Sequence, residues 1–215
     1  MVTQKEIFRQ SEGDNWHTRN EKRLREYQAN PHCDPVLFTL GMVDLLPRRV
    51  CEIGASDGWR LEVLRKKYGC EVWGVEPSQK AVMAGKSLFR EVHLEVGSAD
   101  HLPFEASSFD CLTFGFCLYL CDRDDLPQIV SEADRVLKPG GHLIIYDFFT
   151  EKPMRVPYAP MAGVFSYKMD YSSLFDSYPN YSVLSRQLFQ MSSHQPISKI
   201  SDPNDTTAVF ILKKQ

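Results

Sequence analysis

The sequence has 215 residues, of which 43% are hydrophobic and 25% charged, and its formal net charge is −3. This size and composition predict one globular domain with a sizeable core, and the charge gives no electrostatic footprint for nucleic acid. No apolar run approaches the ~20 residues of a membrane-spanning helix, and the first residues lack an apolar signal region. We therefore expect a cytoplasmic monomer or homodimer with no nucleic-acid or membrane partner.

The N-terminal part of the sequence is helical in pattern. Residues 15–30 are polar and rich in helix formers, and residues 35–46 carry apolar side chains at helical spacing. We expect residues 1–46 to form a helical cap on a main domain that covers residues 47–215.

After residue 47 the apolar period changes from helical to strand-like. Short apolar runs at 49–54, 70–76, 91–97 and 109–116 predict strands, with helices over 59–69 and 77–89 between the first three. Residues 125–137 predict another helix, ended by a turn at 138–141, and residues 142–149 form a continuous apolar run typical of a buried strand. Strands that alternate with helices predict a mainly parallel sheet covered on both faces.

The C-terminal part has a different character. Residues 151–180 contain four prolines and many aromatic side chains, which predicts a loop-rich insertion. The pattern leaves open whether this insertion is ordered when no ligand is bound. The runs 181–192 and 206–214 predict an antiparallel pair of strands. The expected fold is α/β, with a doubly wound, seven-stranded, mainly parallel sheet that ends in a C-terminal antiparallel strand.

The six cysteines include no Cys-x-x-Cys pair, and most of them lie at strand-like apolar positions. This pattern predicts buried free thiols, with no metal site and no disulfide framework. Cys117 and Cys121 would face each other only on a helix, which we do not expect there.

A glycine turn follows the first predicted strand, in Val-Cys-Glu-Ile-Gly-Ala-Ser-Asp-Gly (residues 50–58). Glycines at such a turn let the backbone approach a ligand without a Cβ in the way. The spacing is not the Gly-x-Gly-x-x-Gly of dinucleotide sites, and Glu52 beside Asp57 would repel a pyrophosphate. Glu52 could instead hold the ammonium group of an amino-acid-like ligand.

Three further motifs follow in order. Glu76 stands 22 positions after Gly54, at the end of the second predicted strand, where an acid can accept both hydroxyls of a ribose. Gly-Ser-Ala-Asp-His-Leu-Pro-Phe (97–104) follows the third strand, and Arg-Val-Leu-Lys-Pro-Gly-Gly (135–141) precedes the fifth.

This ordered set, over about residues 48–150, resembles the class I S-adenosylmethionine-dependent methyltransferase family, specifically its small-molecule branch. The resemblance implies S-adenosylmethionine as cofactor and methyl donor. Ser56 replaces the usual central glycine of the turn, and Ser98 replaces a frequent aspartate; we expect cofactor binding to survive both. The cofactor-binding residues that the resemblance implies in this part of the chain are Glu52, Gly54, Ala55, Gly58, Glu76, Pro77, Ser98, Ala99 and Phe116.

The N-terminal segment Gly-Asp-Asn-Trp-His-Thr-Arg-Asn (13–20) is similar to methyltransferases of bacterial surface-sugar pathways, including pseudaminic acid clusters. This similarity implies that Trp16, Arg19 and Asn20 form a lid over the cofactor's carboxylate and the acceptor. It also suggests a small polar acceptor, such as a sugar or a sugar-nucleotide.

Methyl transfer is an in-line displacement, so the protein mainly supplies alignment and exclusion of water. Asp147, at the end of the fifth strand, and Tyr119, just beyond the fourth, are the candidate catalytic residues. Tyr158, Lys168 and Tyr171 of the insertion are the candidate acceptor-binding residues, with Lys168 suited to an acidic acceptor.

Two other functions remain open. A nicotinamide-dependent Rossmann oxidoreductase is disfavoured by the glycine spacing. A noncatalytic module that binds the nucleoside cofactor without turnover is favoured slightly by Ser56 and Ser98.

Overall fold

The computed structural model describes residues 2–176, 178 and 180–215; residues 1, 177 and 179, which fall in the predicted cap and insertion, lie outside the described residues. The α-helices are α1 (Gln4–Ile7), α2 (Gly13–Ala29), α3 (Pro35–Leu40), α4 (Trp59–Tyr68), α5 (Gln79–Leu88) and α6 (Leu126–Val136). The strands are β1 (Arg49–Ile53), β2 (Glu71–Glu76), β3 (His93–Val96), β4 (Phe109–Gly115), β5 (Leu137–Phe148), β6 (Met154–Pro157), β7 (Phe165–Lys168), β8 (Tyr181–Gln190), β9 (Pro196–Ile197) and β10 (Thr206–Lys214).

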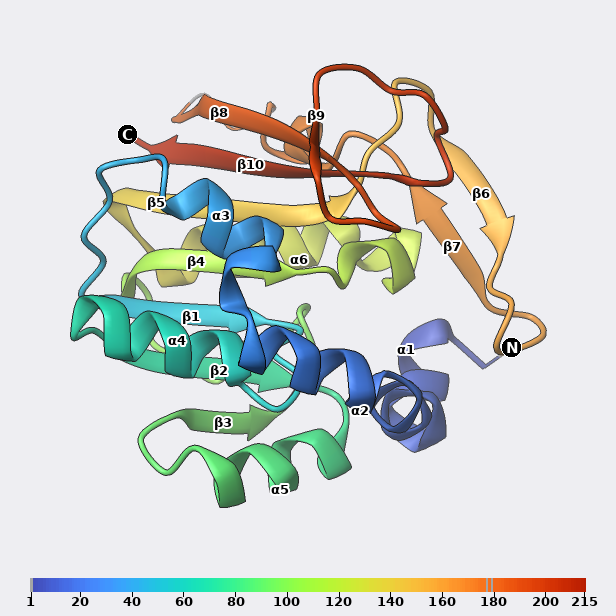
Figure 1. The fold of residues 1–215 in the computed structure, drawn as a ribbon, viewed down its shortest axis with the longest axis horizontal. Coiled ribbons are helices and arrows are strands. Elements are labelled where there is room, and N and C mark those ends of the chain that lie inside the picture. Colours follow the sequence, from blue (N-terminus) through green and yellow to red (C-terminus); the bar gives the residue numbers. More distant parts are fainter. Residues whose placement is uncertain (1, 177, 179) are drawn as a thin grey trace.

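The main sheet has the strand order β3-β2-β1-β4-β5-β10-β8-β9 (Figure 1). Strands β1 to β5 pair in parallel, and β10 lies antiparallel between β5 and β8. The predicted doubly wound α/β fold with a C-terminal antiparallel strand is therefore confirmed. The sheet has eight strands rather than seven because the two-residue strand β9 adds to β8.

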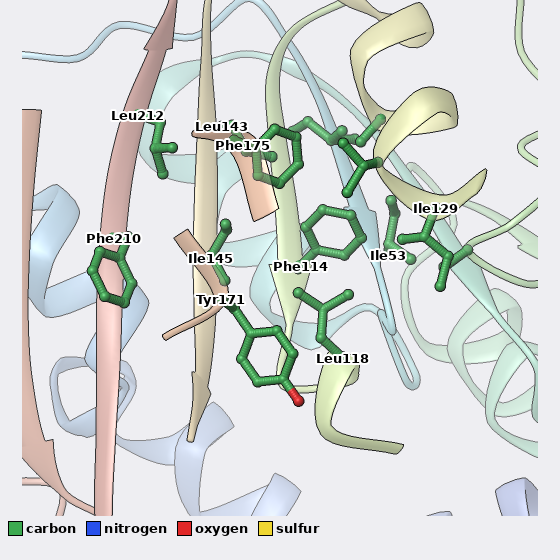
Figure 2. Packing of buried hydrophobic residues seen from close by; sticks show 14 of the residues in the cluster. Ile53, Phe114, Leu118, Ile129, Leu143, Ile145, Tyr171, Phe175, Phe210 and Leu212 are labelled. Atoms are coloured by element: carbon green, nitrogen blue, oxygen red, sulfur yellow. The ribbon is translucent and has the colours of Figure 1, made fainter. Parts of the chain in front are cut away.

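Helices cover both faces of the sheet, as the apolar runs predict. Along β1, Val50 packs in one buried cluster with α3 and α4, whereas Ile53 packs in the other with α6. Figure 2 shows the α6 side, where Phe114 of β4 lies between Ile145 and Ile129. Ile53 and Ile129 also line a cavity, described below, so this core forms part of the cavity wall.

Helix α3 is shorter than expected. It ends at Leu40, where the Gly41 N–H closes the last turn onto Leu37 and Phe38 carbonyls, so the helix predicted to residue 46 is wrong in its second half. Met42 and Leu46 are largely exposed, and no packing surface holds them in a helix. Pro47 also disfavours helical backbone at the residue before it.

Two other local predictions are wrong. The segment 138–141, expected to be a turn, is the extended start of β5, and the positive φ of Gly140 accommodates a register shift against β4. A short 3₁₀-helix, η3 (Leu118–Leu120), joins Cys117 to Cys121 where no helix was expected, and the two residues approach through Cys121 Sγ and the Cys117 carbonyl at 3.5 Å.

The insertion is more regular than its prolines suggest. Strands β6 and β7 form an antiparallel hairpin, and a 3₁₀-helix, η5 (Tyr171–Phe175), follows them. Tyr171 and Phe175 are both only 1% exposed and belong to the main core. The insertion therefore packs on the main core through η5.

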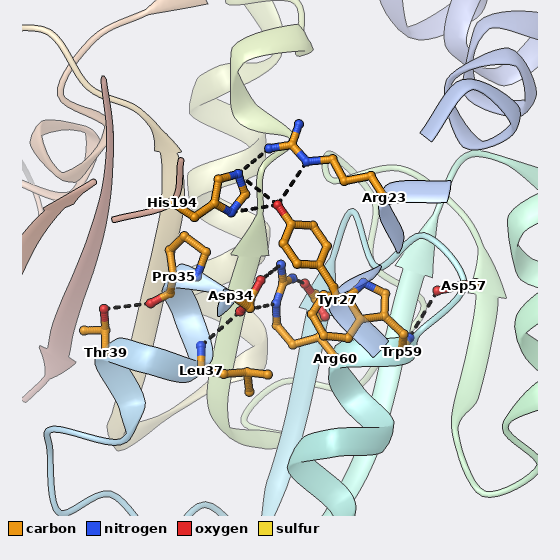
Figure 3. Close-up of polar contacts among 11 residues, drawn as sticks. Arg23, Tyr27, Asp34, Pro35, Leu37, Thr39, Asp57, Trp59, Arg60 and His194 are labelled. Atoms are coloured by element: carbon orange, nitrogen blue, oxygen red, sulfur yellow. Dashed lines mark hydrogen bonds and ion pairs between the residues drawn. The ribbon is translucent and has the colours of Figure 1, made fainter. Parts of the chain in front are cut away.

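The N-terminal helical region runs without a break from α1 through a π-helix, η1 (Phe8–Glu12), into α2. Near its end, Tyr27 meets His194 of the loop between β8 and β9, with the tyrosine hydroxyl 2.7 Å from His194 Nδ1 (Figure 3). In the described part of the chain, no helix has the length and apolar character that crossing a membrane requires.

Candidate functional site

A cavity opens at the carboxyl ends of β1, β2 and β4, where ligands of doubly wound sheets bind. The space between its walls, including the part that is open to solvent, is about 890 Å³. The sheet loops contribute Gly54, Ser56, Glu76, Pro77, Ser98, Ala99, Asp100, Phe116 and Cys117 to its wall, and the N-terminal helices contribute Lys5, Phe8, Arg9, Gly13 and Trp16.

The glycine turn after β1 forms the floor of this cavity. Gly54 has a φ of +76°, and its N–H donates to the Val75 carbonyl at 2.8 Å, which ties the turn to β2. A Cβ on Gly54 would lie 2.7 Å from the Cβ of Cys117. Glycine is therefore required here for both conformation and space. Ala55 and Gly58 complete the turn but do not line the cavity.

Glu76 is fixed at the edge of the cavity by backbone donors. Its Oε2 accepts from the Ser56 N–H and its Oε1 from the Ser78 N–H, both at 2.9 Å. Burial raises the pKa of this carboxyl to about 7. Each carboxylate oxygen retains a lone pair, so the group can accept the two vicinal hydroxyls of a ribose.

Ser56 stands where the resemblance noted above would have a central glycine. Its φ is +50°, and its Oγ lies 3.3 Å from Nδ1 of His17, which is only 5% exposed. Helix α2 thus supplies a polar partner for the substituted side chain. This contact, which sequence reasoning missed, links the N-terminal region to the floor of the cavity.

Glu52 lies behind the turn and outside the cavity wall. It forms a buried cluster with Arg60 and Asp34, in which Arg60 Nη2 lies 2.9 Å from Asp34 Oδ2 and Arg60 Nη1 bonds Glu52 (Figure 3 shows Arg60 and Asp34). Burial raises the pKa of Glu52 to about 7, and its Oε2 has no partner among the described residues. This geometry favours a role for Glu52 in orienting the loop over the expected role of holding the ammonium group of a ligand.

The predicted N-terminal lid residues separate in the structure. Trp16 lines the cavity, but Arg19 bonds the buried Glu12 and donates to the Tyr158 hydroxyl at 3.0 Å. Asn20 donates to the Trp16 carbonyl within α2. Arg19 and Asn20 therefore support the helix that carries Trp16, and neither lines the cavity.

Asp147 and Tyr119 are buried beside the cavity and do not line it. Asp147 is 2% exposed, and its oxygens accept from the backbone N–H groups of Phe148 at 2.8 Å and Tyr119 at 3.3 Å. Burial raises the pKa of Asp147 to about 7. The Tyr119 ring packs 4.8 Å from that of Phe116. Asp147 thus holds η3 against β5, and the catalytic roles expected for Asp147 and Tyr119 stay predictions.

The insertion residues expected to bind the acceptor also lie outside the cavity. Lys168 is 6% exposed and donates to the backbone and side chain of Asn204, and the hydroxyl of Tyr171 donates to the Tyr167 carbonyl at 2.7 Å. Tyr158 donates to Glu12 at 3.1 Å. The contacts of these three side chains are within the protein, and their role in acceptor binding stays a prediction.

Sequence reasoning missed the contribution of residues 4–12 to the cavity. A signal was present, since Thr3 and Glu6 form a capping box that starts a helix. The position of that helix over the cavity depends on long-range contacts, which no local pattern shows.

We predict that Gly54→Ala weakens ligand binding far more than Gly140→Ala, although both replacements place alanine at a similar positive φ. Gly140 has nearly the same φ, +77°, but no atom lies within 4 Å of its Cβ position. Both alanine variants should lose about 1–2 kcal/mol of unfolding free energy to the left-handed backbone. Only Gly54→Ala should also reduce cofactor affinity, by about tenfold or more, in calorimetric titration. Equal binding by the two variants would contradict this prediction.

Residues 51–145, a little under half of the chain, match a family model described as "Methyltransferase domain". The chain is 36% identical over 77 residues to the ubiquinone/menaquinone biosynthesis C-methyltransferase UbiE of Vibrio cholerae, covering 35% of this chain and 28% of that protein. It is 35% identical over 100 residues to a demethylmenaquinone methyltransferase of Lactobacillus johnsonii, covering 46% of this chain and 36% of that protein. The chain spans about half or less of the length of the curated relatives it matches.

Among solved structures, the chain is similar to the 1,6-didemethyltoxoflavin-N1-methyltransferase of Burkholderia thailandensis, crystallised with 1,6-didemethyltoxoflavin and S-adenosylhomocysteine. The TM-score is 0.70 at 15% identity, and the match covers 97% of this chain and 87% of that chain. The structural match confirms the expected fold, and the family-model match shows that residues 51–145 are similar to a methyltransferase domain. They do not show the similarity to surface-sugar enzymes.

Proposed function

We propose that the protein transfers a methyl group from S-adenosylmethionine to a small-molecule acceptor. The observation that carries this proposal is the pairing of Glu76, fixed by two backbone N–H groups, with the open glycine turn at Gly54 on one cavity wall. This arrangement suits a ribose joined to an amino-acid chain. It does not suit a pyrophosphate, because a carboxylate borders the space that the phosphates would need.

Each part of the cofactor has a matching part of the wall. Glu76 would accept the ribose hydroxyls, and Pro77, Ser98 and Ala99 would border the adenine. The turn at Gly54 would lie under the methionyl chain, and the bound cofactor supplies the methyl group on a sulfonium. Trp16 and Phe116, both lining the cavity, would exclude water where the methyl group is transferred.

The acceptor site is proposed from the side chains that the cofactor would leave free. The aromatic residues Phe8, Trp16 and Phe116 line the cavity, and so does Arg9, which is exposed. Lys5, which also lines the cavity, is neutralised by Asp100 and Asp125, and Arg19 is paired with Glu12. No ion pair of Arg9 is found among the described residues.

We therefore propose a small polar acceptor that carries an acidic group. A sugar-nucleotide satisfies this description through its phosphates, which keeps the surface-sugar prediction open. A planar aromatic acceptor is the second candidate, favoured by the three rings and by the quinone and toxoflavin methyltransferases among the similar proteins.

The first test is calorimetric titration of the purified chain with S-adenosylmethionine, S-adenosylhomocysteine and reduced nicotinamide dinucleotide. Micromolar binding of the first two supports the proposal. Binding of the nicotinamide alone, or of none of the three, would overturn it. Methyl transfer from labelled cofactor to a panel of acidic and neutral small molecules then separates an enzyme from a noncatalytic binding module.

We predict that Arg9→Met selectively slows methylation of acidic acceptors. A charge-assisted hydrogen bond contributes about 1.5–3 kcal/mol, so kcat/KM for an acidic acceptor should fall about tenfold or more. The value for a neutral acceptor should change little. Lys22→Met, at an exposed site on α2, is the matched control. An equal loss for acidic and neutral acceptors would exclude the anion-binding role of Arg9.

A further inference from the structure

The N-terminal helical region crosses the cavity from one rim to the other. At one end, Lys5 Nζ lies 2.7 Å from Asp100 Oδ2 and 2.8 Å from Asp125 Oδ2. At the other end, Asp14 accepts from Ser78 Oγ at 2.6 Å and from the Lys80 N–H at 3.0 Å. Phe8 and Gly13, which lie between these ends, line the cavity. A ligand in the cavity is therefore covered by residues 5–16.

Lys5 joins two parts of the cavity wall that come from different elements. Asp100 lies in the loop after β3, directly after Ser98 and Ala99, and Asp125 precedes α6. All three residues of this bridge line the cavity, and their side chains are 20–29% exposed. The two carboxylates raise the pKa of Lys5, so it is charged at any ordinary pH.

The charge balance at this rim depends on Lys5. A third carboxylate, Asp122, also lines the cavity, and it accepts from the backbone N–H groups of Gln4 and Lys5 at 3.1 and 2.8 Å. Without the Lys5 ammonium, Asp100 and Asp125 would face the negative Asp122 with no counter-charge from the helix. Repulsion would then favour an open rim.

We propose that Lys5 is a positioning residue whose bridge to Asp100 and Asp125 holds the N-terminal helix closed over the bound cofactor. Opening of this bridge then controls the exchange of S-adenosylmethionine for S-adenosylhomocysteine. This inference rests on the proposed function. Gln4 anchors the same helix by a separate contact, since its side chain bonds the backbone of Leu120 and Phe165. Loss of Lys5 should therefore loosen the cover without detaching the helix.

The test is the dissociation rate of tritiated S-adenosylhomocysteine, chased with excess unlabelled ligand, from the full chain and its variants. Lys5→Met should release the ligand about tenfold faster, while Lys5→Arg, which keeps the charge, should restore most of the slow release. Asp125→Asn, which breaks the bridge from the other side, should accelerate release without adding to the effect of Lys5→Met. Lys22→Met should behave as the wild type.

Salt provides an independent readout. Raising the ionic strength from about 20 mM to about 500 mM should accelerate release from the wild type and leave Lys5→Met nearly unchanged, because surface ion pairs are screened. Thermal unfolding of the ligand-free variants should stay close to that of the wild type. Equal release rates for Lys5→Met and Lys22→Met, or faster release that tracks lost thermal stability and is not restored by arginine, would overturn the inference. Absence of S-adenosylhomocysteine binding to the wild type would instead overturn the proposed function and the inference with it.

Discussion

Replacing Glu76 by alanine is expected to weaken binding of S-adenosylhomocysteine by a factor of about 100 or more. Hydrogen bonds to a charged group contribute about 1.5–3 kcal/mol each, and the proposed ribose contact uses two of them. The same change removes the acceptor of the Ser56 and Ser78 N–H groups, which loosens the turn beneath the ligand.

The control is Glu71→Ala, at the exposed start of the same strand, β2. It should change neither the affinity nor the fold. Calorimetric titration measures both variants, and circular dichroism checks that they are folded. Retention of wild-type affinity by Glu76→Ala would contradict the assigned cofactor orientation.

The affinity should also depend on pH through Glu76. Burial raises the pKa of this carboxyl to about 7, so in the ligand-free chain it gains a proton as the pH falls below that value. The protonated group loses an acceptor for a ribose hydroxyl, and the affinity should fall by up to about tenfold per pH unit below 7. Titrations between about pH 5.5 and 8 test this, and Glu76→Gln should remove most of the dependence.

The same pKa shift has the opposite effect on folding of the ligand-free chain. The folded carboxyl binds its proton more tightly than the unfolded one, whose pKa is near 4.5. The contribution of Glu76 to the free energy of unfolding therefore falls as the pH rises from about 4.5 to 7. The pH dependences of binding and of stability should therefore have opposite signs.

Arg60→Met is expected to lower the free energy of unfolding by about 3–5 kcal/mol. Arg60 is 9% exposed and Glu52 and Asp34 are each 1% exposed, so its loss would leave two buried carboxyl groups without a positive partner. Breaking a buried ion pair from one side costs several kcal/mol, because the remaining charge is neither solvated nor paired. Denaturant unfolding measures the change.

Two variants locate the origin of this loss. Arg25→Met removes an exposed ion pair with Glu21 and should cost less than about 1 kcal/mol. Adding Glu52→Gln and Asp34→Asn to Arg60→Met removes the unpaired charges, so the triple variant should recover part of the stability. A loss of under 1 kcal/mol in Arg60→Met would show that the cluster does not stabilise the fold.

The sheet could be predicted from the sequence because its signals are local. Buried parallel strands give continuous apolar runs, and Gly54 and Gly69 mark the ends of β1 and α4, where the chain needs a positive φ. The C-terminal end of α3 was missed because the apolar spacing of residues 41–46 persists after the packing surface has ended. Met42 is 66% exposed despite its helical spacing.

Local sequence signals could locate some residues of the cavity, whereas the surroundings of other predicted site residues depend on tertiary contacts. The floor at Gly54 and the position of Glu76 follow from their places after β1 and β2. Lys168, by contrast, had the chemistry of an anion-binding residue, but Asn204 and the Phe148 ring, 4.1 Å from its Nζ, occupy it. Ser56 contacts His17 on α2, which is 39 residues away in sequence. No local sequence pattern predicts this contact.

The order of strands in the sheet differs from their order along the chain, and this matters while the protein is being synthesised. Strand β8 leaves the ribosome before β10, yet β10 is the strand that joins it to β5. Until β10 follows, on the order of seconds later, β8 can pair only with the two-residue strand β9. During that interval the edge of β8 that later pairs with β10 is open to pairing with another molecule.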